Sequence, residues 1–149
     1  MMKKIELFTI GFTEKNAEKF FSLLKNSGVK KVVDVRISNT SQLAGFARKD
    51  DLPFFLNTIG NIGYEHVLEF APELEMMKAY RNKKFSWNEY EKKYLALMKK
   101  RNVDKIFPAD YYDGSCFLCS EHEPEFCHRR VLAEFLKMEI PGIEIIHLM

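Results

Sequence analysis

The residues between positions 114 and 130 combine thiol, carboxylate, imidazole and guanidinium side chains within one short stretch of chain. An apolar run ends there at Cys119, and a polar loop follows. Pro124 then predicts the start of a helix that carries a second cysteine, a histidine and two arginines in its first two turns. A helix N-terminus presents unpaired N–H groups and partial positive charge, so it acidifies a nearby thiol and attracts anions. This mixture of groups predicts a functional site.

Cys119 and Glu121 lie where the apolar run ends, and we expect them to act as nucleophile and general base. Glu121 can alternatively bind backbone amides. His128 is either their catalytic proton partner or a histidine of the core. Cys127 lies four residues before Val131 on the apolar stripe of its helix. It is therefore either a substrate contact or a buried inert thiol.

Asp34 and Arg36 lie two positions apart on an expected strand, so their side chains share one face. They form either a structural ion pair or a ligand site, in which Asp34 is catalytic and Arg36 binds an anion in bidentate fashion. Arg129 and Arg130 are neighbours in the last helix, so only one of them can face a pocket. We assign the substrate contact to Arg129, because Arg130 can reach Glu134 one turn later.

The elements that position these residues follow from the apolar pattern. We expect strands over residues 5–10, 31–36, 62–67, 115–119 and 143–148. We expect helices over residues 14–26 (with Thr13 as N-cap), 52–59, 73–83, 87–102 (with a capping box of Ser86 and Glu89) and 124–138. Strands that alternate with helices predict one Rossmann-like, three-layer α/β domain over residues 1–149, with a mostly parallel sheet flanked by helices.

Polar clusters stand at three expected carboxyl ends of strands, around Gly11 and Thr13, around Arg36 and Ser41, and at Cys119. Ligands of parallel α/β sheets bind beyond these ends. If the strand order makes the ends neighbours, the clusters form one pocket. The backbone N–H of Gly11 then helps to bind an anionic group.

The amino-acid composition limits the classes of protein to which the chain can belong. The chain has 149 residues, of which 46% are hydrophobic and 30% charged, as in an ordinary globular domain. Its net charge of +2 leaves nucleic-acid binding possible but does not indicate it. No run approaches the roughly 20 apolar residues of a membrane span, so we expect no membrane partner. Three crowded cysteines are a poor disulfide framework, and reduced thiols in a cytoplasm are the better interpretation.

Cys116 and Cys119 resemble half of a zinc site. A strand sends them to opposite faces, however, and Cys116 is then a core residue. Cys127 and His128 can add ligands, but adjacent residues of a helix diverge by about 100°. We therefore expect no metal and no other cofactor, and keep a structural thiol or zinc site as an alternative.

Six short motifs, distributed over nearly the whole chain, carry a family resemblance. They are Thr9-Ile10-Gly11, Val33-Asp34-Val35-Arg36, Ser41 with Phe46, Ile62-Gly63-Tyr64, Leu118-Cys119-Ser120-Glu121 and Cys127-His128-Arg129. On these motifs the chain resembles the family known as domain of unknown function 488. The resemblance implies an α/β fold in a cytoplasmic, mostly prokaryotic protein and no agreed activity. Many members have Gly-His-Ser after the first strand, where this chain has Gly11-Phe12-Thr13. A histidine at that place therefore has no part in a mechanism here.

These observations favour an enzyme, hydrolase- or transferase-like, whose partner is an anionic small-molecule or nucleotide-like substrate. One alternative is a non-catalytic module that binds a nucleotide or nucleic acid in the same pocket. The other is the structural thiol or zinc site. The sequence names neither the substrate nor the reaction nor the oligomeric state.

Overall fold

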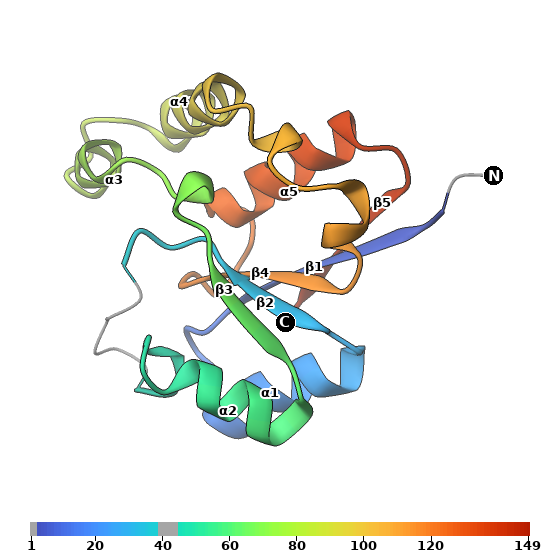
Figure 1. The fold of residues 1–149 in the computed structure, drawn as a ribbon. Coiled ribbons are helices and arrows are strands. Elements are labelled where there is room, and N and C mark those ends of the chain that lie inside the picture. The colour runs from blue at the N-terminus through green and yellow to red at the C-terminus, as the bar shows by residue number, and fades with distance from the viewer. Residues whose placement is uncertain (1–2, 39–44) are drawn as a thin grey trace.

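The computed structural model describes residues 3–38 and 45–149 of the chain (Figure 1). Within these residues, five parallel strands form one sheet in the order β3-β2-β4-β1-β5. The strands are β1 (Ile5–Gly11), β2 (Lys31–Asp34), β3 (Gly63–His66), β4 (Ser115–Cys119) and β5 (Ile143–Leu148). The expected parallel sheet is confirmed, and β4 lies at its centre although it is fourth along the chain.

Helices cover both faces of the sheet and complete the three layers (Figure 1). On one face lie α1 (Ala17–Ser27) and α2 (Leu52–Gly60), and on the other lie α3 (Leu74–Arg81), α4 (Trp87–Lys100) and α5 (His128–Glu139). In the described part of the chain, four short 3-10 turns connect these elements, over Gly45–Ala47, Leu68–Phe70, Val103–Lys105 and Ala109–Tyr112. None of the described helices is both long and apolar enough to span a membrane.

The central strand β4 contributes alternate side chains to the two halves of the core. Cys116 and Leu118 pack with the apolar residues of α1 and α2. Phe117 and Cys119 pack with those of α4 and α5. The two cysteines therefore lie on opposite faces, as expected for a strand. Cys116 is fully buried, and burial raises the pKa of its thiol.

The start of α1 differs from the expectation. Thr13 does not cap the helix. Asn16 does, because its side chain accepts a hydrogen bond from the backbone N–H of Lys19 at 2.8 Å. Glu14 has a φ of 62°, and the N–H of Thr13 donates to the carbonyl of Ser120 at 3.0 Å. The first residues of the expected helix are thus a loop tied to the β4–α5 connection.

The start of α5 is the second correction. The helix begins at His128, four residues later than Pro124 predicts. Pro124 instead lies in a turn, where its carbonyl accepts from the N–H of Cys127 at 3.2 Å. Cys127 is the N-cap residue and has an extended backbone, with φ −137° and ψ 137°. All other expected boundaries lie within two residues of the observed ones, and the capping box of α4 is present.

Candidate functional site

The sheet brings the polar strand ends together. Gly11 at the end of β1 pairs with Cys119 at the end of β4. Asp34 at the end of β2 pairs with Leu118 on the other side of β4. The carboxyl ends of β1, β4 and β2 are therefore neighbours. This is the strand order under which the sequence predicts one pocket.

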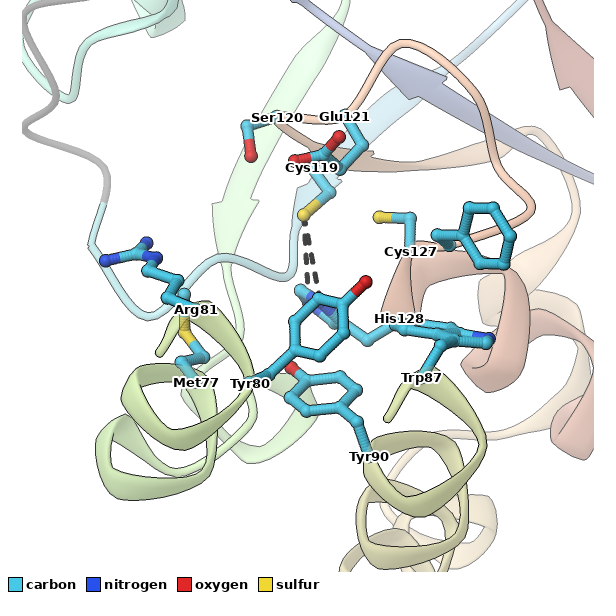
Figure 2. Close-up of a pocket in the computed structure, with 11 residues that line it drawn as sticks. Met77, Tyr80, Arg81, Trp87, Tyr90, Cys119, Ser120, Glu121, Cys127 and His128 are labelled. Carbon is cyan, nitrogen blue, oxygen red and sulfur yellow. Dashed lines mark hydrogen bonds between the residues drawn. The ribbon is translucent and has the colours of Figure 1, made fainter. Parts of the chain in front are cut away.

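Cys119 lies where two hollows adjoin. The first, of about 120 Å³, is lined by the end of β4, the start of α5 and aromatic side chains of α3 and α4 (Figure 2). The second, of about 250 Å³, extends from Cys119 toward Phe12 and Arg36. The two hollows share five lining residues, Met77, Arg81, Cys119, Ser120 and His128. The thiol of Cys119 thus borders both cavities at once.

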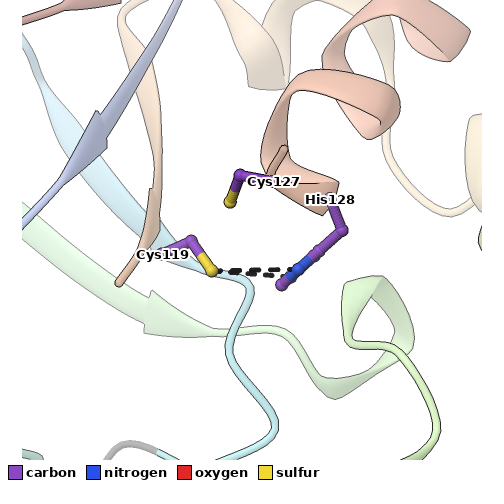
Figure 3. Close-up of side chains that lie close together, drawn as sticks. All are labelled: Cys119, Cys127 and His128. Carbon is purple, nitrogen blue, oxygen red and sulfur yellow. Dashed lines mark hydrogen bonds between the residues drawn. The ribbon is translucent and has the colours of Figure 1, made fainter. Parts of the chain in front are cut away.

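Three side chains converge at this point, Cys119, Cys127 and His128 (Figure 3). The Sγ of Cys119 is 3.8 Å from Nδ1 of His128, and donor atoms of all three lie within 4.8 Å of one another. Nε2 of His128 is 2.9 Å from the carbonyl oxygen of Val35. The expectation that Cys127 and His128 diverge is wrong, because Cys127 precedes the helix and has an extended backbone.

The pKa values of the two thiols of the site are shifted in opposite directions. A hydrogen bond from Cys127 lowers the pKa of Cys119, and the backbone N–H of Ser120 and the charge of Arg129 add to this effect against the cost of burial. Burial and the interaction with Cys119 raise the pKa of Cys127 well above its ordinary value. Of the two thiols, Cys119 therefore ionises more readily, and Cys127 is the one placed to donate a hydrogen bond.

Arg129 stabilises the loop after β4 through hydrogen bonds to its backbone. Its side chain is fully buried, and its Nη1 and Nη2 donate to the carbonyls of Glu121 and His122 at 2.6 and 3.2 Å. Its Nε donates to Oγ1 of Thr9 at 3.4 Å. Gly11 lies against the same loop, since a Cβ there would be 1.6 Å from the carbonyl oxygen of Glu121. Both residues hold the loop beside the hollow, and neither is among the described residues that line it.

Asp34 and Arg36 form a buried ion pair. The carboxylate of Asp34 accepts from Nε and Nη2 of Arg36 at 2.8 and 2.7 Å and from the hydroxyl of Tyr64 at 2.6 Å. Nη2 of Arg36 also donates to the carbonyl of Ala47 at 2.7 Å. Asp34 is completely buried and lines neither hollow within the described part of the chain. Arg36 is 6% exposed and lines the second one.

The remaining expected site residues are placed differently. Glu121 is exposed and lines the first hollow. Thr13 is also exposed and joins the site only through its backbone. Ser41 lies outside the described residues. Arg130 is paired with Glu134 at 2.8 Å on the surface, as its spacing predicts.

Sequence reasoning did not find the aromatic side chains that form one wall of the first hollow. The rings of Trp87 and Tyr90 stack at 5.2 Å, Tyr80 lies 5.1 Å from Tyr90, and Phe126 lies 5.8 Å from Trp87 (Figure 2). Arg81 joins this wall. The apolar stripe of α4 predicts a buried Trp87, but its ring is only half-buried and borders the hollow. No spacing in the sequence connects α3 and α4 to Cys119, so only the fold reveals the wall.

A protein-family model matches most of the chain. The family model described as Domain of unknown function DUF488 matches residues 16–136. The chain belongs to the DUF488 family. No curated protein and no solved structure matches the chain significantly. The range matched by DUF488 includes Cys119, Cys127 and His128, whereas Gly11 and Thr13 precede it.

Proposed function

We propose that this DUF488 protein is an enzyme that uses Cys119 as a nucleophile on a small anionic, nucleotide-like substrate. The observation that carries the proposal is the position of Cys119 Sγ, which borders two hollows and lies 3.8 Å from an imidazole nitrogen. Cys116 offers an internal contrast, because it is sealed on the opposite face of the same strand. The lowered pKa of Cys119 supports the same role.

His128 supplies the proton in the proposed first step. A carbonyl oxygen only accepts, so Nε2 of His128 carries a proton toward Val35. Sγ of Cys119 lies 3.8 Å from Nδ1 and 3.9 Å from Nε2, and Nδ1 is the nitrogen left for proton transfer. The Cys119 thiolate forms a bond to the electrophilic atom of the substrate, and the bond to the leaving group breaks with its electron pair. Protonated Nδ1 gives its proton to the leaving group, and His128 becomes neutral.

Glu121 is the base proposed for the second step, since it lines the same hollow. It takes a proton from the water molecule that attacks the covalent intermediate. The bond from the transferred group to Cys119 breaks, the sulfur returns as a thiolate, and the proton passes from Glu121 to His128. With another acceptor in place of water, the same steps give a transferase.

Arg81 and Arg36 are the proposed contacts for the anionic group. Arg81 is shared by both hollows, and Arg36 extends along the second one. Arg36 keeps its sequence-based assignment, whereas Arg81 replaces Arg129, because all three guanidinium nitrogens of Arg129 donate to Thr9 and to loop carbonyls. The half-buried indole of Trp87, which borders the first hollow, adds an aromatic surface against which a flat ring can pack. A guanidinium beside aromatic rings suits a phosphate attached to a base.

Reduced thiols are required for this chemistry. Cys116, Cys119 and Cys127 are all free. The proposal therefore includes a reducing compartment such as the cytoplasm, where thiols of this kind persist.

Limited alkylation with iodoacetamide tests the proposed nucleophile. Peptide mass spectrometry of the folded protein is expected to find Cys119 modified first, with Cys116 and Cys127 modified only after unfolding. Mononucleotides are expected to slow the modification, and Arg81→Ala is expected to weaken this protection. Equal rates of modification at all three cysteines would overturn the proposal.

A turnover assay separates the enzyme from the binding module. Wild type, Cys119→Ser and the matched control Cys116→Ala are incubated with a panel of nitrophenyl esters and phosphoesters of anionic compounds. We expect product with wild type and Cys116→Ala and none with Cys119→Ser. Protection by mononucleotides without any product formation would instead support the non-catalytic module.

A further inference from the structure

Two thiols and one imidazole form the most compact group of soft donor atoms among the described residues (Figure 3). Cys119 comes from the end of β4, and Cys127 and His128 come from the start of α5. Their donor atoms lie within 4.8 Å of one another. The parallel sheet and the N-terminus of α5 preorganise all three.

The distances fit a tetrahedral metal ion. With Zn–S bonds of about 2.3 Å and Zn–N bonds of about 2.0–2.1 Å, the tetrahedral angle separates a sulfur from a nitrogen ligand by about 3.5 Å. The Sγ of Cys119 and Nδ1 of His128 are 3.8 Å apart, only a few tenths of an ångström more. This one distance is close to the value expected for two ligands of a shared ion, and a turn of the His128 ring is needed to direct Nδ1 at that ion.

The imidazole of His128 is anchored through one nitrogen, and Sγ of Cys119 lies 3.8 Å from its Nδ1 and 3.9 Å from its Nε2. Because the sulfur is almost equidistant from the two nitrogens, the ring has to turn before the Nδ1 lone pair and the sulfur can share a metal ion. Its Nε2 lies 2.9 Å from the carbonyl oxygen of Val35, so this nitrogen carries the proton and Nδ1 offers its lone pair. The ring of Tyr94 packs beside it with centroids 5.2 Å apart. A backbone carbonyl that fixes the distal nitrogen of a ligating histidine is the common arrangement around protein-bound zinc.

Charge and burial favour a divalent ion. Two thiolates and a neutral imidazole around a divalent metal make a neutral group, which suits side chains that are at most 6% exposed. Arg36 is paired with Asp34, whereas the positive charges of Arg129 and of Arg81, which lines the hollow, remain near the two sulfurs. These charges favour the thiolate forms that a divalent ion needs. The hollow of about 120 Å³ beside the three donors has room for a fourth ligand.

We propose that Cys119, Cys127 and His128 form a site for a zinc-class divalent metal, with the fourth coordination position open to the hollow. Sulfur and imidazole donors select zinc or cobalt over magnesium and calcium, which prefer oxygen ligands. Binding displaces a proton from each thiol and from Nδ1 wherever those atoms carry one.

The metal and the substrate compete for the same sulfur. This consequence rests on the proposed function, because a Cys119 lone pair donated to a metal is not available to attack an electrophile. The metal-loaded protein is then a resting form of the enzyme, and release of the metal restores the nucleophile.

Titration with cobalt tests the site. The full chain is reduced, freed of metal with a chelator, and titrated with Co²⁺ in an anaerobic cuvette. We expect the visible bands of tetrahedral cobalt and a thiolate charge-transfer band, both saturating at one equivalent and both abolished by one equivalent of Zn²⁺. The same titration of Cys116→Ala, which removes a cysteine from the opposite face of β4, is expected to give an unchanged result.

Variants of the ligands complete the test. Cys127→Ser and His128→Gln are expected to weaken cobalt binding more than 100-fold, and circular dichroism checks that each variant is folded. Binding that saturates below half an equivalent in wild type, or that survives unchanged in both variants, overturns the proposal. Alkylation of the metal-free protein is a separate measurement, so the metal site and the nucleophile can fail independently. Protection of Cys119 by Zn²⁺ is expected only if both are correct.

Discussion

Replacement of Asp34 by alanine is expected to destabilise the protein severely. The carboxylate of Asp34 is completely buried and accepts hydrogen bonds from the backbone N–H, Nε and Nη2 of Arg36, at 3.2, 2.8 and 2.7 Å. It also accepts from the hydroxyl of Tyr64 at 2.6 Å. Among the described residues, the guanidinium of Arg36 in Asp34→Ala keeps the carbonyl of Ala47 and the face of Phe12, whose centroid is 5.3 Å away.

The size of the stability loss follows from the charge of Arg36, which stays buried without a partner. Removing one partner of a buried ion pair costs about 3–5 kcal/mol, because the other charge stays buried without its partner. Arg36 is only 6% exposed, so water cannot replace the lost carboxylate. We therefore expect a loss of about 4 kcal/mol in the free energy of unfolding. For a domain of this size that corresponds to a decrease of about 10 °C in Tm.

Urea denaturation followed by circular dichroism measures this loss in a double-mutant cycle with Arg36→Met. Each single variant leaves one buried charge, whereas the double variant leaves none. The double variant is therefore expected to lose at least about 2 kcal/mol less than the sum of the single losses. The exposed Asp50→Ala is the matched control and is expected to change stability by less than about 0.5 kcal/mol. A loss below about 1 kcal/mol in Asp34→Ala, or strict additivity in the cycle, would refute the reasoning.

Three further predictions concern the site and its supports. Cys127→Ala removes the main cause of the lowered pKa of Cys119, so the pH profile of Cys119 alkylation in the metal-free protein is expected to move to higher pH; an unchanged profile contradicts the assignment of the donor. Gly11→Ala places a Cβ 1.6 Å from the carbonyl oxygen of Glu121. We expect the variant to lose more than about 3 kcal/mol in the free energy of unfolding, measured by urea denaturation. A neutral effect would show that the loop after β4 is free to move. Ser86→Ala removes the N-cap bond of α4 and is expected to cost about 1 kcal/mol without changing the alkylation of Cys119.

Local signals in the chain predicted most of the fold. The apolar runs of β1, β4 and β5 and the capping box at Ser86 identified these elements to within one or two residues. Such signals depend on side chains a few positions apart, which remain neighbours whatever the rest of the chain does. The same holds for Asp34 and Arg36, whose spacing on one strand already allowed the ion pair that the structure contains.

The start of α5 shows where local signals fail. Pro124 is a favourable first residue of a helix, and the sequence gives no sign that the helix begins later. The tertiary structure draws the preceding loop toward the end of β1, where the buried guanidinium of Arg129 binds the carbonyls of Glu121 and His122. The N–H groups of Phe12 and Thr13 also donate to the carbonyls of Cys119 and Ser120. Together these bonds outweigh the preference of the proline and leave Cys127 as the extended N-cap residue.

The sequence by itself determined the parallel α/β architecture, the family and the residue types gathered at the end of β4. Only the tertiary structure decided that Cys119, Cys127 and His128 converge, that Arg129 serves the loop, and that α3 and α4 supply an aromatic wall. The physical reason is that strand periodicity and helix caps arise from neighbours along the chain. A site of this kind instead depends on the order of strands in the sheet and on where distant helices pack.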